Sequence, residues 1–200
     1  DLLIDKKINN DKKSLLLKNM KTDIQRMNNL ITDISNYTLT QVEMSDELFY
    51  NFNLVDFLKN FLDNYPQNSK NISIKYKFDK EPVIVHANKD KLAQIFINLI
   101  ENSISFSPQN SEIFIEQKIH DKMIVVILID QGPGIPQNLS NKIFERFYTE
   151  RVNNQTAHTG LGLSIAKKIV ESFYGTIKLS KSGTKQYLGA CFQIKLPLKE

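Results

Sequence analysis

The apolar run MIVVILI at residues 123–129, which ends at once in Asp130-Gln-Gly-Pro-Gly, restricts the fold more than any other feature. A run of this length is typical of a β-strand, and it is far shorter than the roughly 18 residues of a membrane-spanning helix. The glycines and the proline end regular strand pairing within a few residues. The sequence therefore places a lone carboxylate, Asp130, at a strand end where the chain bends with little side-chain bulk.

Further segments predict strands and helices around this run. Residues 71–78 alternate, residues 82–87 are apolar, and residues 112–119 and 122–130 predict a hairpin joined by His120 and Asp121. Two closing strands are expected at 175–180 and 190–197, and helices after the N-cap Asn53, at 90–107 and at 162–174. Because helices mix with adjacent antiparallel strands, we expect an α+β fold, a sheet with helices on one face.

The N-terminal region has a different pattern. Residues 14–45 contain no Gly or Pro and predict one long helix, with a narrow apolar stripe formed by Leu17, Ile24, Met27, Ile31 and Ile34. Such a stripe favours packing against a partner helix, with packing on its own domain as the alternative. We therefore expect two units, residues 1–50 and residues 51–200. The chain begins at Asp1 rather than Met, so we expect it to be part of a longer protein.

Composition excludes some classes of function. The net charge is only +4 and the lysines are scattered, which argues against nucleic-acid binding. The single cysteine, Cys191, lies in an apolar segment and is expected to be a buried core residue.

Candidate ligand-binding residues lie in three places. Asn98 and Asn102 share one helix face, and amide oxygens can bind Mg²⁺ beside phosphate oxygens, although surface asparagines are common on helices. Asp130 can accept a hydrogen bond from a ligand amino group, and the glycines that follow can admit a flat ligand or simply form a turn. The segment GLGLS, residues 160–164, opens a helix whose N–H groups suit phosphate oxygens.

The order of these segments carries a family resemblance. NLIENSISFSP (98–108), DQGPGIP (130–136), IFERFYTE (143–150) and GLGLSIAKKIVE (160–171), closed by GACFQIKLP, resemble the N box, first glycine box, F box and second glycine box of sensor histidine kinases of two-component systems. The resemblance covers roughly residues 53–198. It implies the two-layer α/β sandwich shared with gyrase, MutL and heat-shock chaperone ATPases.

The resemblance also implies a site and a reaction. ATP would be the cofactor with Mg²⁺, and Asp130 would receive the adenine amino group. Residues 137–159 would form a lid over the nucleotide. The remaining implied roles are adenine contact by Gly132 and Gly134, phosphate contact by Gly160, Leu161, Gly162 and Leu163, Mg²⁺ binding by Asn98 and Asn102, and lid anchoring by Phe144, Phe147 and Tyr148.

Residues 24–41 resemble the second helix of the dimerisation and phosphotransfer hairpin, and RFYTER resembles ChvG/ExoS-type sensors. The implied parent is a homodimer at the cytoplasmic side of the inner membrane. Its implied partners are a response regulator receiver domain and a histidine-bearing helix of its own or the partner subunit.

Three departures from the family pattern bear on activity. Ser105 stands where a Lys or Arg is usual, and Thr149 stands at an Arg position of the F box. The phosphoacceptor motif is absent, and His86, His120 and His158 lack its helical context. We therefore expect transfer to a histidine outside this chain. ATPase and serine-kinase relatives carry a Glu base where this chain has Asn98, and a degenerate or non-kinase ATP-binding module is the remaining alternative.

Overall fold

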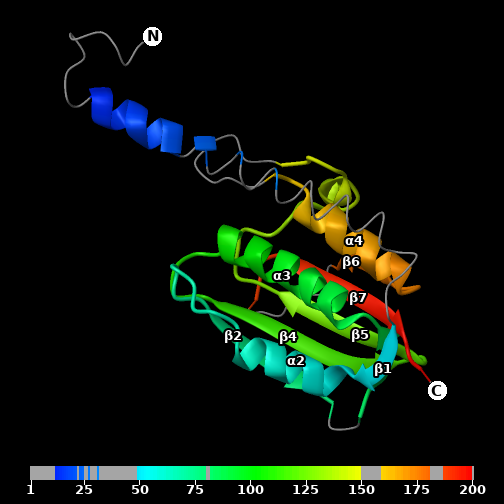
Figure 1. Cartoon of the computed structure of the whole chain (residues 1–200). Coiled ribbons are helices and arrows are strands. Elements are labelled where there is room, and N and C mark those ends of the chain that lie inside the picture. The colour runs from blue at the N-terminus through cyan, green and yellow to red at the C-terminus, as the bar shows by residue number, and fades with distance from the viewer. Residues whose placement is uncertain are drawn as a thin grey trace.

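The structure, a computed structural model, describes residues 12–21, 23–24, 27, 31, 49–79, 82–149, 159–180 and 187–199. Figure 1 shows the arrangement of its elements. In chain order they are β1 (Tyr50–Asn53), α2 (Leu54–Asp63), β2 (Ser73–Phe78), β3 (Ile84–Ala87), α3 (Lys89–Phe106), β4 (Glu112–His120), β5 (Met123–Ile129), the 3-10 helices η2 (Gln137–Leu139) and η3 (Lys142–Phe144), α4 (Gly162–Ser172), β6 (Thr176–Leu179) and β7 (Cys191–Pro197).

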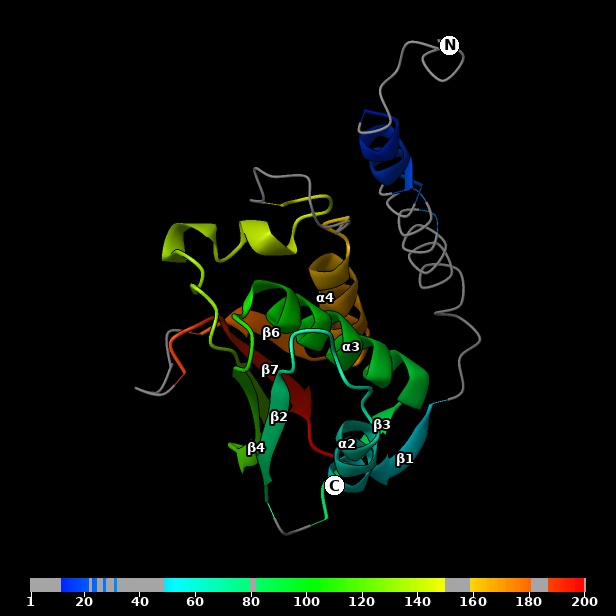
Figure 2. The same ribbon diagram turned by 90° about the vertical axis from the view of Figure 1, so that its left-hand side faces the viewer.

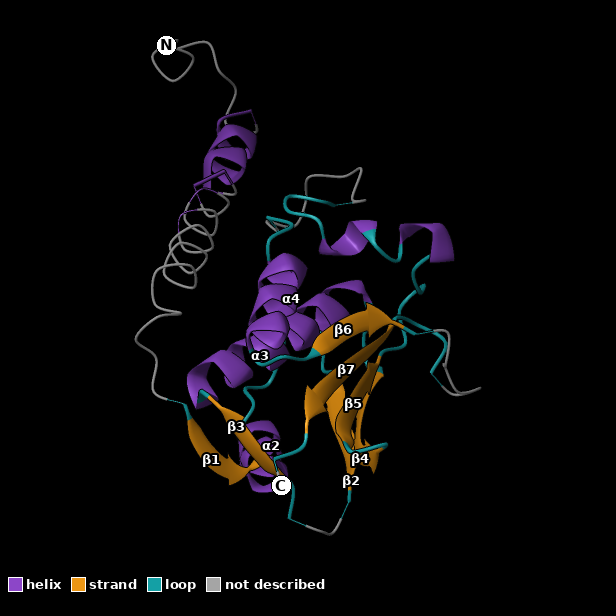
Figure 3. Ribbon diagram, turned by 90° about the vertical axis from the view of Figure 1, so that its right-hand side faces the viewer, coloured by secondary structure: helices purple, strands orange, loops and turns teal. Residues whose placement is uncertain are grey.

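The main sheet has five strands in the order β2-β4-β5-β7-β6. β2 pairs parallel to β4, whereas the other pairs are antiparallel. Strands β1 and β3 form a separate two-stranded sheet. Figure 3 shows α3 and α4 gathered on one side of the main sheet, so the expected α+β sandwich is confirmed.

The side-chain alternation of β5 shows how the layers form. Ile124, Val126 and Leu128 point into the core that α2, α3 and α4 share. The intervening residues, Val125, Ile127 and Ile129, belong to a second small cluster on the other face with Tyr187 and Cys191. The apolar run is therefore continuous because both faces of this central strand are buried.

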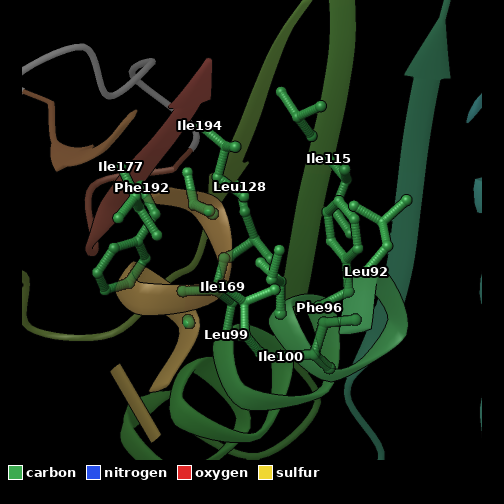
Figure 4. Packing of buried hydrophobic residues seen from close by; sticks show 14 of the residues in the cluster. Leu92, Phe96, Leu99, Ile100, Ile115, Leu128, Ile169, Ile177, Phe192 and Ile194 are labelled. Carbon is green, nitrogen blue, oxygen red and sulfur yellow. The ribbon is translucent and has the colours of Figure 1, made fainter. Parts of the chain in front are cut away.

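Helix α3 lies at the centre of the core. Its residues Leu92, Phe96, Leu99 and Ile100 are almost completely buried. Figure 4 shows them beside side chains from β4, β5, β7 and α4, among them Ile169. This packing fixes α3 between the end of β5 and the start of α4, where the candidate ligand-binding residues lie.

Local signals decide where several elements begin and end. The Asn53 side chain accepts a hydrogen bond from the Val55 N–H (3.1 Å), which confirms the expected N-cap of α2. The hairpin turn lies at Asp121 and Lys122, both with positive φ, one residue later than expected. The strand β1 was not predicted at all.

The described N-terminal residues 12–21, 23–24, 27 and 31 are helical, and other parts of the expected helix, including Ile34, lie outside the described residues. Leu17, Ile24, Met27 and Ile31 are each more than half exposed. These stripe residues therefore do not pack on the domain, and their packing on a partner helix stays a prediction. Among the described residues, no helix is long and apolar enough to cross a membrane.

Candidate functional site

Asp130 is a buried carboxylate held by three hydrogen-bond donors. Its Oδ1 accepts from the N–H groups of Gly132 (2.9 Å) and Ala190 (2.9 Å), and its Oδ2 accepts from Ser103 Oγ (3.1 Å). The residue is only 1% exposed. Burial raises the pKa of Asp130 above its usual value, and the three hydrogen bonds oppose that shift. The geometry thus presents a fixed acceptor at the end of β5, as its position in the sequence predicted.

Two glycines, Gly189 and Gly132, lie so close to the Asp130 carboxylate that a side chain at either position would crowd it. A Cβ on Gly189 would overlap Asp130 Oδ1, and the Gly189 N–H donates to the Asp130 carbonyl (3.0 Å). A Cβ on Gly132 would lie 3.1 Å from Asp130 Oδ1 and 3.2 Å from the Phe106 carbonyl oxygen. The neighbours at Gly132 are therefore protein groups, and its contact with a ligand ring stays a prediction.

Gly134 has a conformational reason to be glycine. Its φ is +76°, and a Cβ there would lie 3.4 Å from the Leu188 carbonyl oxygen. The first glycine box is thus packed against the segment that leads into β7.

Asn98 connects α3 to the start of α4. Its Oδ1 lies 3.5 Å from the position of a Cβ on Gly162. Its Nδ2 is buried, and no described residue offers it a hydrogen-bond partner. Asn102 lies one turn further along α3, and the next residue, Ser103, reaches Asp130. Helix α3 therefore joins the two halves of the candidate site.

These residues fit an Mg²⁺ ion that is held chiefly by a ligand. Among the described residues, no group of three or more His, Cys, Asp or Glu side chains could hold a metal. Mg²⁺ is commonly bound through one or two protein oxygens together with phosphates and water. The unpaired Asn98 Nδ2 is a donor and suits a phosphate oxygen of such a ligand, whereas Mg²⁺ binding through the amide oxygens stays a prediction.

The start of α4 can receive an anion. No side chain in the described part of the structure caps the first turn of this helix. The Leu161 N–H donates to Thr159 Oγ1 (3.3 Å), while the Leu161 side chain is buried in the core and Leu163 is half-buried against it. The N–H groups that begin at Gly162 therefore carry the positive end of the helix dipole without a side-chain acceptor.

Gly160 is packed tightly against the F box. Its φ is +73°, and a Cβ there would lie 2.7 Å from both the Phe147 carbonyl carbon and the Tyr148 carbonyl oxygen. The Phe147 N–H donates to the Gly160 carbonyl (3.1 Å). The second glycine box thus ties down the C-terminal end of the F box.

The prediction that three aromatic residues anchor the lid agrees only in part with their burial. Phe144 is 8% exposed and packs edge-on against Phe192 (6.4 Å between ring centroids), with Ile143 buried beside it. Tyr148 is half-buried against the core. Phe147 is 60% exposed, so its prediction as an anchor was wrong.

The segment that is expected to form a lid, residues 137–159, contains two 3-10 helices that its sequence did not indicate. Figure 2 shows the segment with η2 and η3 beyond the ends of α3 and α4. Residues 150–158 lie outside the described part of the chain, and so do Arg151 and His158.

Lysine 70 contributes a charge near the departure at Ser105. Its Nζ donates to the carbonyl oxygens of Ser105 (2.7 Å) and Ser107 (2.8 Å), at the C-terminal end of α3. A cation there stabilises the negative end of the helix dipole. This contact explains how the end of α3 is stabilised, but it does not replace the usual side chain at position 105.

Sequence patterns missed Ser103, Gly189 and Ala190. Ser103 directly follows Asn102 in the N box, and the other two begin the closing GACFQIKLP segment. The pattern of that segment indicated only a strand, although its first residues surround Asp130.

Comparisons with known proteins agree with this arrangement. Residues 87–200 match the family described as histidine kinase-, DNA gyrase B-, and HSP90-like ATPase. The chain is 30% identical to histidine kinase P4 of Formosa agariphila over 94% of this chain and 14% of that protein. It is 32% identical to the sensor protein ChvG of Agrobacterium fabrum over 89% of this chain and 32% of ChvG.

A solved structure gives the same result. The catalytic domain of histidine kinase ThkA has a TM-score of 0.65 and 29% identity, over 76% of this chain and 96% of that one. The chain spans less than half the length of the curated relatives it matches, between 14% and 44% of the first three. The family match over residues 87–200, supported by the four motifs and the likeness to ThkA, leads to one conclusion. The chain belongs to the histidine kinase-, DNA gyrase B- and HSP90-like ATPase family and carries a sensor histidine kinase catalytic domain.

Proposed function

We propose that this chain binds ATP between α3, the end of β5 and the start of α4, and donates the γ-phosphoryl group to a histidine. The observation that carries this proposal is the buried Asp130 carboxylate, held by three donors next to the N-box helix. An ionised carboxylate only accepts hydrogen bonds, so it suits the exocyclic amino group of adenine.

The phosphate groups would lie toward α4. The N–H groups that begin at Gly162 lack a side-chain cap and suit phosphate oxygens. Gly160, Leu161 and Leu163 would shape this end of the site, and Asn98 and Asn102 would hold Mg²⁺ through their amide oxygens. The ion would neutralise charge on the phosphates during transfer.

The residue at position 98 favours a histidine acceptor. Asn98 cannot accept a proton at neutral pH, so this site lacks the Glu base that would activate water or a serine. An imidazole needs no such base because it is already nucleophilic. We therefore expect slow hydrolysis and transfer to a histidine.

That histidine would lie on a helix outside these 200 residues. His86 is in β3 with its Nδ1 2.9 Å from Asn51 Oδ1, and His120 ends β4 beside Asp121. Neither lies on a helix. The acceptor helix would belong to the same or the partner subunit.

The remaining features concern the parent protein. Residues 1–50 would contribute to its dimerisation region and residues 51–200 would form the ATP-binding unit. A response regulator would receive the phosphoryl group; this is supported by a solved structure of histidine kinase ThkA in complex with the response regulator protein TrrA. Attachment at the cytoplasmic side of the inner membrane is part of the same proposal.

Calorimetry tests the binding site. We expect ADP and ATP to bind, and Mg²⁺ to strengthen the binding of ATP. Asn102→Ala should reduce the Mg²⁺-dependent gain, and Asp130→Asn should weaken both nucleotides. Asn60→Ala, at an exposed position of α2, serves as the control and should change neither. Wild-type affinity in both site variants would contradict the assigned pocket.

Radiolabelled ATP tests the transfer. The chain alone should gain no acid-labile phosphohistidine, and a separate fragment with a phosphoacceptor helix should become labelled when it is added. Stable label on the 200-residue chain by itself would refute this division of roles. Tight binding with no label on any added fragment would instead indicate a degenerate nucleotide-binding module.

A further inference from the structure

The hydrogen bonds that the described residues make to the Asp130 carboxylate leave a single acceptor position for a ligand. A carboxylate offers about two acceptor positions on each oxygen. On Oδ1 both are used, by the N–H groups of Gly132 and Ala190 at 2.9 Å each. On Oδ2 one is used by the Ser103 hydroxyl at 3.1 Å. The position that remains is therefore on Oδ2, beside Ser103.

We infer that Ser103 is a positioning residue of the base pocket, whose hydroxyl holds Asp130 ionised and turned so that Oδ2 receives the amino group of a 6-aminopurine. This inference rests on the proposed function. A 6-oxopurine, such as hypoxanthine, presents an acceptor oxygen at the same place and is rejected by an ionised carboxylate. Ser103 would thus help the pocket to select adenine over 6-oxopurines.

Protonation of Asp130 would reverse this selection. A protonated carboxyl group can donate to the oxygen of a 6-oxopurine, and it has lost an acceptor for the amino group. Burial favours that neutral form, because it raises the pKa of Asp130. The Ser103 hydroxyl opposes the shift by donating to the charged form. Without Ser103, the carboxyl group would be protonated at a higher pH.

The backbone N–H groups of Gly132 and Ala190 also favour the charged form of Asp130, but every Ser103 variant retains them. The segment 131–134 and the segment before β7 contribute backbone N–H groups. Among the described residues, the titratable neighbour is the Cys191 thiol of β7, whose pKa is raised chiefly by burial and further by the charge of Asp130. That thiol stays neutral in the range where Asp130 titrates, so Ser103 is the side-chain hydroxyl that acts on the carboxylate from α3.

The test measures binding of ADP and of inosine diphosphate by calorimetry between about pH 5 and about pH 8. ADP affinity should fall below a pH midpoint that reports the protonation of Asp130. In Ser103→Ala this midpoint should move up by about one pH unit, because the free energy of a hydrogen bond to a charged group corresponds to roughly one unit of pKa. Near that midpoint, discrimination between ADP and inosine diphosphate should fall about tenfold. Ser103→Thr keeps the hydroxyl and should restore the wild-type pH profile.

Two further variants separate this role from a structural one. Ser107→Ala removes another buried hydroxyl of the same helix end, one without a hydrogen-bond partner among the described residues, and should leave the profile unchanged. Ser103→Cys, with a weaker donor, should shift the midpoint in the same direction as alanine but by less.

The possible failures are distinguishable. Binding of ADP by wild type and Ser103→Ala with the same pH midpoint would overturn the inference about Ser103 and leave the ATP site standing. A wild-type chain that binds no ADP at any pH would overturn the proposed function and this inference with it.

Discussion

Replacement of Gly160 by alanine tests whether the second glycine box ties down the F box. The new Cβ would lie 2.7 Å from two backbone atoms, the Phe147 carbonyl carbon and the Tyr148 carbonyl oxygen. Position 160 also has a φ of +73°, and a non-glycine residue in this left-handed conformation is less stable by about 1–2 kcal/mol. Separation of the two segments would break the hydrogen bond from the Phe147 N–H to the Gly160 carbonyl, worth about 1 kcal/mol.

These contributions sum to a local loss of about 2–4 kcal/mol, including some cost for the close contacts. The loss should appear as local opening of the F box, because a surface segment can separate without unfolding the core. Hydrogen exchange followed by NMR should show the Phe147 amide exchanging about 30- to 700-fold faster in Gly160→Ala. Amides of Leu99 and Val126 in the core should exchange as in the wild type.

Gly162→Ala is the matched control from the same motif. Its Cβ would make an ordinary 3.5 Å contact with Asn98 Oδ1, and its backbone is helical. Alanine there favours the helix. We expect Phe147 to keep its protection in this variant. Unchanged exchange of Phe147 in Gly160→Ala, or equal acceleration in both variants, would refute the packing argument.

Two further predictions concern stability. Because burial raises the pKa of Asp130, protonation of this carboxyl group favours the folded state. Its contribution to the free energy of unfolding is therefore fully present below the pKa of the unfolded state and is lost as pH rises through the pKa of the folded state. Asp130→Asn should therefore raise the urea midpoint at neutral pH while weakening ADP binding, and the gain should vanish below about pH 4; equal midpoints at neutral pH would contradict this. Lys70→Met removes two hydrogen bonds to the end of α3 and should lower the free energy of unfolding by about 1–2 kcal/mol in urea denaturation. Lys75→Met, at an exposed position of β2, is the control, and an equal loss in both would argue against the contact.

Local patterns predicted most elements because their signals lie within a few residues. The apolar run of β5 and the periodic face of α3 are such signals, and both elements formed close to the expected bounds. β1 was missed because the strand has only four residues, too few for a clear alternating pattern, and ends at the Asn53 N-cap. The parallel pairing of β2 with β4 depends on a crossover through β3 and α3, which neither strand encodes locally.

The same distinction between local signals and distant contacts applies to the candidate site. The motifs indicated Asp130 and the glycine boxes, whereas Ser103 and Ala190 act on a residue 27 and 60 positions away. No local pattern reports such contacts. The family resemblance implied that Phe147 anchors the lid, yet its backbone has φ +62° and its ring is exposed.

The contact between Asp130 and Ala190 has a consequence for the order of events during synthesis. The carboxylate is made 60 residues before the amide that completes its hydrogen bonds. Until the segment leading into β7 has emerged and docked, Asp130 Oδ1 lacks one of its two donors. Closing so long a loop is entropically costly and comes late. A growing chain could therefore not complete the hydrogen bonds of Asp130 before the segment leading into β7 is in place, and nucleotide capture at the proposed site would mark a finished domain rather than a partly folded one.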